Sequence, residues 1–328
     1  MGGDGVKRVV LAALMLVLIQ FLLPVLLLSG RVPVREDRPD RLQPTVRPGG
    51  DQAQTVVLLQ EDGGVERLSL AEYLRGVVAA EMPASFELEA LKAQAVAART
   101  YWVAARGDKH APADICGDSG CCQAYCSSKE AAEKWGEKAR EYTERIARAV
   151  TETNGLIALY EDRPIQAVYF SSASGSTVDA VAVWGSAVPY LVSVASPEGE
   201  EVPNWRSEMT VTTARFKELV TAQYPEADFS GPVNRWLSDF EWQPSGTVSR
   251  VKVGGVELTG GQVRKLLGLR SACFSVGAEG DDLVFQTTGY GHGVGMSQYG
   301  ANALAKQGKD FREILSWYYT GVQVAPMK

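Results

Sequence analysis

The most uniform pattern in the chain is an uncharged apolar run at residues 9–28, VVLAALMLVLIQFLLPVLLL, preceded by Lys7 and Arg8. About 20 apolar residues cross the roughly 30 Å hydrocarbon core of a bilayer, and a short basic flank favours a cytoplasmic N-terminus. We therefore expect a single-pass membrane anchor within residues 1–30, with the rest of the chain outside the cytoplasm. The alternative is a cleaved signal peptide, although the apolar core of such a peptide usually has about 7–15 residues.

The next segment, residues 31–54, is rich in Pro, Arg, Asp and Gly and has little to bury. This composition predicts a flexible extracytoplasmic stalk. The folded part is expected to begin at Thr55 and to continue to residue 328, as one domain that could contain two subdomains.

Apolar residues then recur every three or four positions, the spacing of one helical face. In residues 87–107 these are Leu88, Leu91, Ala95 and Trp102, and Ser85 is the expected N-cap. Further helices are expected at residues 68–80, 129–153, 213–224, 301–305 and 311–319.

Runs of β-branched and aromatic residues between turn residues predict strands. A hairpin is expected at residues 155–174, with its turn at 161–164, and other strands at 55–60, 188–196, 273–276 and 283–287. Long helices beside antiparallel strands indicate an α+β fold. The expected architecture is thus a membrane anchor followed by a mixed helix and antiparallel-sheet domain.

Composition narrows the function classes. The chain has 328 residues, of which 45% are apolar and 22% are charged, as is typical of a globular protein with an ample core. Its net charge of −6 and pI near 5.2 argue against a nucleic-acid-binding protein, which normally presents a basic face.

One carboxylate stands in an apolar setting, in GVVAAEMPASF at residues 76–86. Burial disfavours the charged form of a carboxylate and raises its pKa. Glu81 could therefore hold a proton at neutral pH and donate it to a leaving oxygen. Pro83 is expected to place Glu81 at the entrance of the next helix, so a second interpretation is that Glu81 only interacts with that helix N-terminus.

A histidine and four cysteines gather in HAPADICGDSGCCQAYC, namely His110, Cys116, Cys121, Cys122 and Cys126. One histidine and three cysteines at this spacing suit tetrahedral zinc, and four protein ligands would make the zinc structural. A disulfide with spare thiols is the alternative outside the cytoplasm.

The segment TGYGHGVGMSQYG, residues 288–300, holds five glycines and His292, one of only two histidines in the chain. Glycines permit positive φ angles and the close approach of another chain or a ligand. Neither a dinucleotide fingerprint nor a lipase-type serine elbow fits this segment. His292 could bind substrate, orient another group or form a hydrogen bond in the core.

These segments together resemble the SpoIID/LytB family of peptidoglycan enzymes. The resemblance rests on EYLRGVVAAEMPASFELEALKAQAVAARTY (72–101), ICGDSGCCQAY (115–125), YFSSASGSTVDAVAVWGSAVPYLVSV (169–194) and TGYGHGVGMSQYGANALAKQGKDFREILSWYYTGV (288–322). It implies a lytic transglycosylase that forms 1,6-anhydro ends on glycan strands whose stem peptides an amidase has removed. Glu81 would be the catalytic acid and base, and no metal would take part in the chemical step.

The resemblance also implies a structural zinc held by His110, Cys116, Cys121 and Cys122. Cys121 stands where the family often has His, and Cys126 is an alternative ligand.

The chain departs from the family at Ser176 and Val178, where the family tends to have His and Glu. If those two residues help to hold substrate, other groups must do so here. The candidates for the substrate groove are then residues of the final motif: His292, Gln298, Tyr299, Ser297 and Tyr290.

Resemblance further implies a role in sporulation, at the mother-cell membrane and facing the engulfment space. The implied partners are glycan strands, a sporulation amidase and a membrane scaffold protein. The rival hypothesis is a non-catalytic glycan-binding protein that enhances a cell-wall amidase. A zinc hydrolase needs an open metal position, which a four-ligand site does not leave.

Overall fold

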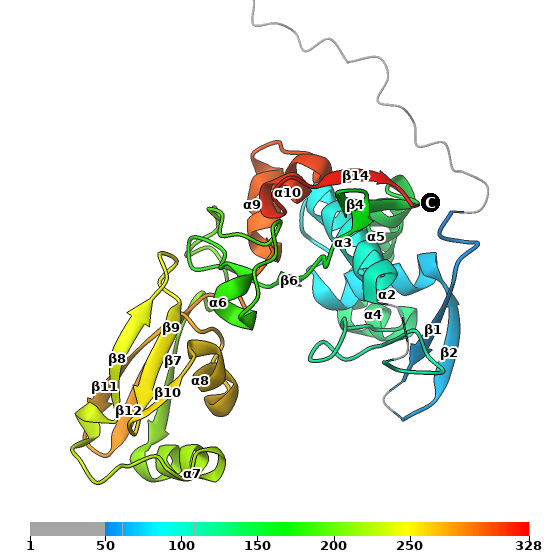
Figure 1. Ribbon diagram of the computed structural model, residues 1–328. Helices are drawn as coiled ribbons and strands as arrows, with labels where there is room; N and C mark the ends of the chain where they lie inside the picture. Colours follow the sequence, from blue (N-terminus) through cyan, green and yellow to red (C-terminus); the bar gives the residue numbers. More distant parts are fainter. Residues whose placement is uncertain (1–49, 61, 106, 108, 328) are drawn as a thin grey trace, which may run out of the picture. The chain divides into compact units, whose positions relative to one another are not determined.

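The computed structural model describes residues 50–60, 62–105, 107 and 109–327 (Figure 1). The expected anchor and most of the expected stalk lie outside these residues. Within the described ranges, no helix is long and apolar enough to cross a membrane. Helices and sheets are mixed along the described chain, which confirms the α+β prediction.

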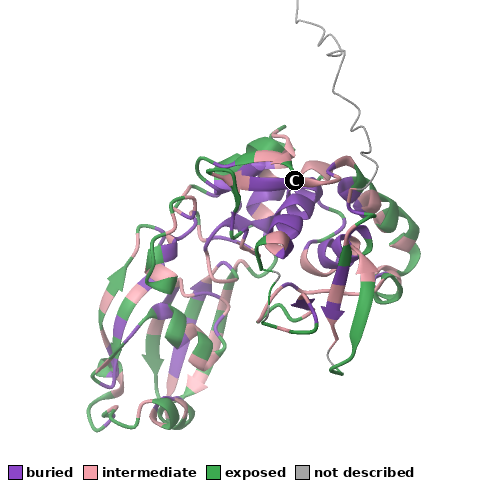
Figure 2. Cartoon of the chain, turned by 45° about the vertical axis from the view of Figure 1, so that its right-hand side comes forward, coloured by how far each residue is buried: buried purple, intermediate pink, exposed green. Residues whose placement is uncertain are grey.

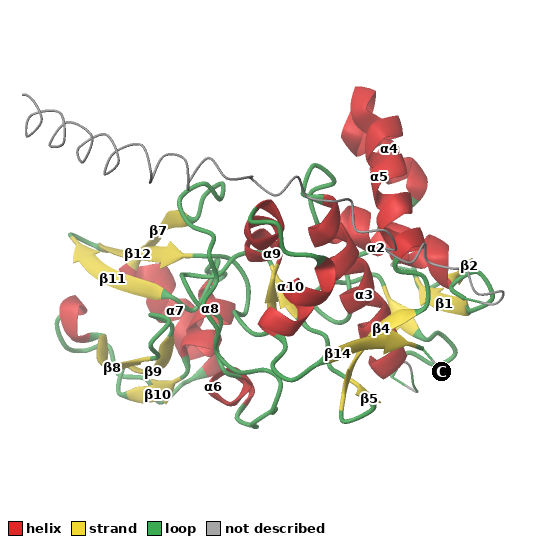
Figure 3. Ribbon diagram, turned by 90° about the horizontal axis from the view of Figure 1, so that it is seen from above, coloured by secondary structure: helices red, strands yellow, loops and turns green. Residues whose placement is uncertain are grey.

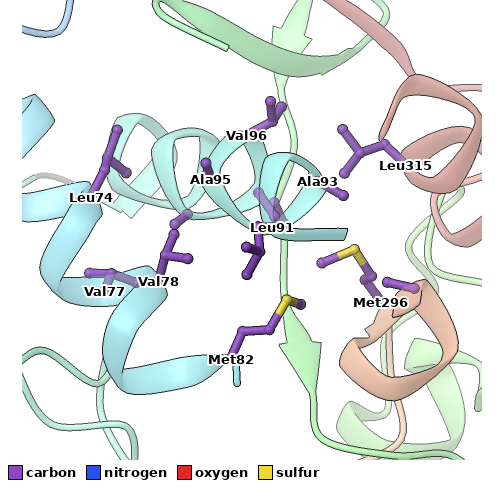
Figure 4. Close-up of a cluster of buried hydrophobic side chains, with 14 of the residues drawn as sticks. Leu74, Val77, Val78, Met82, Leu91, Ala93, Ala95, Val96, Met296 and Leu315 are labelled. Carbon is purple, nitrogen blue, oxygen red and sulfur yellow. The ribbon is translucent and has the colours of Figure 1, made fainter. Parts of the chain in front are cut away.

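The helices of the larger core surround α3 (Leu88–Ala105). Every side chain of α3 from position 90 to position 100 is buried, so the helix is buried all round and has no single apolar face. Its many alanines let neighbouring helices approach closely, and Figure 4 shows Met82 and Met296 beside Leu91 of this helix. The neighbours are α2 (Leu70–Glu81), α5 (Ala139–Glu152), α9 (Gln298–Lys306) and α10 (Phe311–Tyr318).

Two predictions about helix ends differ from the structure. The carbonyl of Glu87 accepts hydrogen bonds from the amides of Ala90 and Leu91, so Glu87 directly precedes α3, and the expected cap Ser85 lies two residues earlier. The single helix expected at residues 129–153 is divided into α4 (Ser128–Trp135) and α5 by a 3-10 turn, Gly136–Lys138. Figure 3 shows α4 and α5 side by side.

Three small sheets accompany the helical core, and two of their strand pairs are parallel, which the sequence did not predict. The expected hairpin at residues 155–174 is confirmed only in part. Glu161 and Asp162 form the turn with positive φ angles, Arg163–Pro164 is already strand, and Tyr169–Phe170 pairs with Met296–Ser297 instead. The strands are β1 (Thr55–Leu59), β2 (Val65–Ser69) and β3 (Ile115–Cys116); β4 (Leu156–Tyr160), β5 (Arg163–Pro164) and β14 (Gln323–Pro326); and β6 (Tyr169–Phe170) with β13 (Met296–Ser297).

The strand expected at residues 188–196 is absent from the described structure apart from one isolated bridge, between Ser176 and Ala195. The amide of Val194 donates to the side-chain oxygen of Thr177, and the amide of Ala180 donates to the carbonyl of Leu191. The segment therefore pairs irregularly with residues 177–180, on both sides of the short helix α6 (Ala180–Trp184).

Residues 206–288 form a β-rich part with its own core of aromatic and aliphatic side chains, centred on Phe216 and Phe285. Figure 2 shows buried and exposed positions alternating along its strands, as expected for sheets with one solvated face. Its elements are β7 (Arg206–Thr212), α7 (Thr213–Gln223), a 3-10 turn (Val233–Arg235), β8 (Leu237–Trp242), β9 (Val248–Val253), β10 (Val256–Leu258), α8 (Gly260–Leu267), β11 (Phe274–Glu279) and β12 (Asp282–Thr288).

A buried ion pair ties the beginning of the described chain to α3. The guanidinium of Arg99 donates to both carboxylate oxygens of Asp51, at 2.8 and 2.6 Å, and both side chains are almost fully buried. The packed domain therefore already includes residue 51, four residues before the start expected at Thr55.

Candidate active site

Glu81 is the last residue of α2. The helix begins with a capping box of Ser69 and Glu72 and ends before Pro83, because the residue before a proline is disfavoured in helical conformation; Met82 is extended. The carboxyl group thus lies at a helix C-terminus, seven residues before α3, and the expected placement at a helix entrance is wrong. The partial negative charge of a C-terminus disfavours an ionised carboxylate.

The carboxyl group of Glu81 is largely buried and has few polar neighbours. One oxygen, Oε1, accepts a hydrogen bond of 2.7 Å from the amide of Ala124. Burial raises the pKa of Glu81, while the amide of Ala124 and the side chains of Gln298 and Tyr169 lower it by less. The net effect is a raised pKa, which a proton donor at neutral pH requires.

A chain of buried polar side chains continues from Glu81. The hydroxyl of Tyr169 donates to Oε1 of Gln123 at 2.8 Å, and Gln123 donates to the hydroxyl of Tyr73 at 3.0 Å. Burial, and then the nearby Glu81, hold the pKa of Tyr169 well above its usual value, so this phenol remains a hydrogen-bond donor. On another side, Nε2 of Gln298 lies 3.5 Å from Oε1 of Gln94.

The glycine-rich segment packs against the chain's own residues 168–178. Its glycines at 289, 291, 293 and 295 all have positive φ angles, and a Cβ atom on any of them would lie 2.9 Å or less from an atom of that segment. Val178 is buried there beside Gly293. The close approach that the glycines permit is thus, in this structure, an internal one.

His292 supports the backbone of Tyr169. Its Nδ1 accepts from the amide of Val294 at 3.1 Å, so Nε2 carries the hydrogen and donates to the carbonyl of Tyr169 at 3.1 Å. Burial lowers the pKa of His292 to about 4, and the imidazole is therefore neutral at pH 7. Its ring contacts those of Phe170 and Trp184.

Ser297 is fully buried and forms the N-cap of α9. Its hydroxyl donates to Oε1 of Glu198, which also accepts from the amide of Ala173 at 2.7 Å. The other oxygen of Glu198 accepts from the hydroxyl of Ser196 at 2.5 Å. Ser297 therefore does not present its hydroxyl to a groove, and instead fixes the helix start that carries Gln298.

Replacement of Glu198 by alanine should destabilise the protein by about 3 kcal/mol, because an unsatisfied buried group costs about 1–3 kcal/mol and three donors lose their acceptor. Urea denaturation measures the change. The control is Glu200→Ala, which removes an exposed carboxylate two residues away. Equal stability of the two variants would contradict this account of the α9 start.

The two tyrosines of the final motif lie apart. Tyr299 is half-buried, with its ring edge-on to Phe86 at 4.9 Å between centroids. Tyr290 is 44% exposed and lies under the guanidinium of Arg270. Of the groove residues expected from the sequence, only Gln298 directly contacts Glu81 among the interactions described for that carboxyl group.

His110, Cys116, Cys121 and Cys122 converge, with their ligand atoms all within 4.8 Å of one another. Nε2 of His110 lies 3.2 Å from Sγ of Cys122 and 3.5 Å from Sγ of Cys121, and the two sulfurs lie 4.0 Å apart. Ligands of a tetrahedral zinc ion stand about 3.3–3.8 Å from each other. The four side chains could therefore hold a metal ion with modest adjustment.

Cys126 is not a member of this cluster. Its thiol instead donates to the carbonyl of Gly76, at 3.6 Å. A Cβ atom at Gly76 would lie 2.2 Å from the ring of Tyr125, so only glycine lets the segment pack against α2. All five cysteines are free thiols in the structure, which does not fit the alternative of a disulfide with spare thiols.

The cluster and Glu81 are connected through one short loop. Cys121 and Cys122 are followed directly by Gln123 and Ala124, the residues that contact Tyr169 and Glu81. Sequence reasoning missed both residues, and also Gln94. For Gln123 and Ala124, the only signal in the sequence was their position directly after the paired cysteines. A backbone amide can act as a donor in almost any residue type, so the identity of Ala124 gives no indication of its role.

Comparison with known proteins gives a consistent set of relatives. A family model described as stage II sporulation protein (SpoIID) matches residues 60–160. Stage II sporulation protein D of Bacillus subtilis (strain 168) is 40% identical over 265 residues, which cover 80% of this chain and 76% of that protein. The protein of the same name from Bacillus amyloliquefaciens is 38% identical, with 80% and 75% covered. An amidase enhancer of Bacillus subtilis is 28% identical over 296 residues, with 76% of this chain and 39% of that protein covered.

Proposed function

Because this chain belongs to the stage II sporulation protein D (SpoIID) family, we propose that it is a lytic transglycosylase that cleaves peptidoglycan glycan strands during sporulation. The observation that carries the proposal is Glu81, a largely buried carboxyl group with a raised pKa and a backbone donor on one oxygen. This environment suits a group that must first donate and then accept a proton.

In the first step, protonated Glu81 donates its proton to the glycosidic oxygen between N-acetylmuramic acid and N-acetylglucosamine. The bond from C1 to that oxygen breaks, and the leaving sugar departs with a hydroxyl group. Ala124 holds one carboxyl oxygen by its amide, so we expect the proton on the other oxygen.

In the second step, the C6 hydroxyl of the same muramic acid attacks C1 and gives its proton to the Glu81 carboxylate. This closes the 1,6-anhydro ring and restores the acid, and no water is consumed. No second carboxylate is among the groups that shift the pKa of Glu81 in the described structure. A tethered hydroxyl removes the need for one, because an intramolecular nucleophile has a high effective concentration.

The sugars need an exposed surface on which they can stack. A pocket of about 260 Å³ is lined by Tyr101, Gln166, Val168 and Trp184, and Val168 is the neighbour of Tyr169. The indole of Trp184 is 44% exposed and packs against His292, so it offers a face for sugar stacking. We assign His292 to positioning, since it holds Trp184 and the backbone of Tyr169.

A structural zinc would be held by His110, Cys116, Cys121 and Cys122, whose sulfur and nitrogen atoms suit it. When bound, it would supply rigidity to the loop that carries Gln123 and Ala124, and it would leave the proton transfers to Glu81.

Analysis of the products tests the reaction. The full chain should convert glycan strands freed of stem peptides into fragments with anhydro-muramic ends, which mass spectrometry distinguishes from ends that carry an added water. Hydrated ends would contradict the proposal and indicate a hydrolase with a second carboxylate.

The cleavage rate should be constant at low pH and fall as the pH rises through the raised pKa of Glu81, because only the protonated carboxyl can donate. A pH profile of kcat measures this limb. Tyr169→Phe removes a hydroxyl group that lowers the pKa of Glu81, so the limb should move to higher pH in that variant. A rate that increases with pH across this range would oppose the assignment.

A second candidate function is favoured by the similarity to an amidase enhancer. In that case the chain would bind glycan without cleaving it and would stimulate an amidase. A folded chain that binds denuded strands and releases no anhydro ends would support this alternative.

The same family membership supports the remaining proposals. We place the domain outside the cytoplasm, held at the mother-cell membrane by residues 9–28. Its partners would be glycan strands, the amidase that removes their stem peptides, and a membrane scaffold protein of the engulfment complex.

A further inference from the structure

Gln123 is almost fully buried, and every hydrogen-bonding group of its side-chain amide has a partner. Nε2 donates to the hydroxyl of Tyr73 at 3.0 Å and to the carbonyl of Ala98, in α3, at 3.4 Å. Because a backbone carbonyl can only accept a hydrogen bond, the amide nitrogen must lie on the side of Ala98. The amide oxygen Oε1 therefore faces Tyr169, whose hydroxyl lies 2.8 Å away.

The direction of the hydrogen bond between Tyr169 and Gln123 follows from this orientation. An amide oxygen has no hydrogen, whereas a phenol has one hydrogen and two lone pairs, so Tyr169 is the donor. While its hydrogen is bound to Gln123, the Tyr169 oxygen offers only lone pairs to other groups. Lone pairs can accept from a protonated carboxyl group, but they repel a carboxylate.

Tyr169 and Glu81 are held by neighbouring residues of one loop. The side chain of Gln123 binds the phenol, and the amide of Ala124 binds the carboxyl group at 2.7 Å. The phenol and the carboxyl group also affect each other. Tyr169 is among the groups that lower the pKa of Glu81, against the larger effect of burial, and Glu81 follows burial among the causes that raise the pKa of Tyr169. The single hydrogen of Tyr169 thus has two possible acceptors, Gln123 and an ionised Glu81.

The other groups around Glu81 do not change charge near neutral pH. In the described structure, Tyr169 is the one titratable side chain among the groups that shift the pKa of Glu81, and the others are a backbone amide and the amide of Gln298. Two cations of the helices α4 and α5, Lys134 and Arg145, donate to backbone carbonyls near the end of α2. The direction of the Tyr169 hydrogen bond is therefore the feature of this site that can follow the charge of Glu81.

We propose that Gln123 is a positioning residue that directs the hydroxyl of Tyr169 away from Glu81 while Glu81 carries its proton, and releases that hydroxyl to Glu81 once the proton has been donated. This rests on the proposed glycan-cleaving function. In the first step, the O–H bond of Tyr169 turns from Gln123 to the new carboxylate, which gains a hydrogen bond to its charged form. In the second step, the carboxylate takes the proton of the sugar C6 hydroxyl, and the Tyr169 hydrogen returns to Gln123. Tyr169 keeps its own proton throughout.

Removal of the competing acceptor tests the proposal. In Gln123→Met the side chain has a similar length but no amide oxygen, so the Tyr169 hydrogen should always be available to the Glu81 carboxylate and lower the pKa of Glu81. The high-pH limb of kcat should move to lower pH, while the rate at low pH stays unchanged. Above the limb, the full chain should cleave denuded strands about two- to tenfold more slowly, the factor that one hydrogen bond contributes.

A second variant covers the case in which Gln123→Met does not fold. Gln123→Asn keeps the amide but withdraws its oxygen from Tyr169 by one methylene group, and should move the limb in the same direction. In a chain that already carries Tyr169→Phe, neither change at Gln123 should move the limb further, because no hydroxyl remains to redirect.

Tyr73→Phe is the matched control, because it breaks the same polar chain on the donor side of Gln123 and leaves Ala98 to fix the amide. It should lower the Tm and leave the limb in place. A limb that stays in place in both Gln123 variants, or that moves equally in Tyr73→Phe, would overturn the proposal.

Infrared spectroscopy without glycan separates this proposal from the proposed function. The difference between each chain and its Glu81→Gln counterpart contains the carbonyl band of protonated Glu81, whose loss with pH reports the titration. If the parent cleaves glycan but the band and the limb are the same in Gln123→Met, Gln123 has no such role while the transglycosylase stands. If the parent cleaves nothing but the band of Gln123→Met disappears at lower pH, the role of Gln123 towards Tyr169 and Glu81 stands and the catalytic proposal fails.

Discussion

Replacement of Glu81 by glutamine should reduce the release of anhydro-muramic ends by at least about 10²–10⁴-fold, the usual contribution of general acid–base catalysis. Glutamine has the same size and can still accept the amide hydrogen of Ala124, but it has no proton to donate. Quantitative mass spectrometry of denuded strands measures the change. Glu87→Gln is the control, because Glu87 is an exposed glutamate on the other side of Pro83 and should retain full activity.

The same substitution should stabilise the fold at neutral pH. A raised pKa means that the folded state binds the Glu81 proton more tightly than the unfolded state. Stability from this group is therefore complete at low pH and is lost as the pH rises through the raised pKa. Thermal unfolding of parent and variant should agree at low pH, and above the raised pKa the variant should have the higher Tm. A variant that is less stable at every pH would show that the carboxylate is well accommodated, and would weaken its assignment as the acid.

Removal of a metal from the four-residue cluster should lower both stability and activity. A ligand present at 1,000 times its Kd stabilises a protein by about 4 kcal/mol, and the loop that is released carries the amide of Ala124 to Glu81. Cys122→Ser should therefore lose bound metal, unfold at a lower temperature and cleave denuded strands more slowly. Elemental analysis, thermal unfolding and product release measure these three effects.

Cys126→Ser provides the comparison within the same segment. Its thiol contacts the carbonyl of Gly76 and lies outside the cluster, so the variant should keep the metal and the activity. Full metal content and activity in Cys122→Ser would contradict the proposal that the cluster holds a metal that supports the active site.

Local pattern was sufficient for much of the helical core. The apolar spacing from Leu88 to Trp102 predicted α3, and the Cys/His spacing brought together four side chains that do converge. The strand predicted from alternating apolar residues at 188–196 is wrong, because such residues can also pack in an irregular segment. Here the amide of Val194 donates to the side chain of Thr177. The spacing also failed to predict that α3 is buried all round, because this depends on elements from distant parts of the chain, among them α5, α9 and α10.

The candidate site was predictable only where residue type carries the chemistry. Glu81 stood out because a carboxylate among apolar residues has a perturbed pKa. The amide of Ala124 and the long-range contacts of Gln123 with Tyr169 and Tyr73 could not be found, since they arise from tertiary folding. The tautomer of His292 likewise depends on two backbone groups, from Tyr169 and Val294, and its neutral state depends on burial by the folded chain.

The ion pair of Asp51 and Arg99 determines how the domain would respond to tension. A pull on the chain preceding residue 50 first meets this buried pair, and through it α3, before it reaches the hairpin of β1 and β2. Breaking one side of a buried pair costs about 3–5 kcal/mol. The pair therefore resists unfolding at the point where the domain would be tethered. Truncation at Thr55 would remove Asp51 and leave the charge of Arg99 buried without its carboxylate partner.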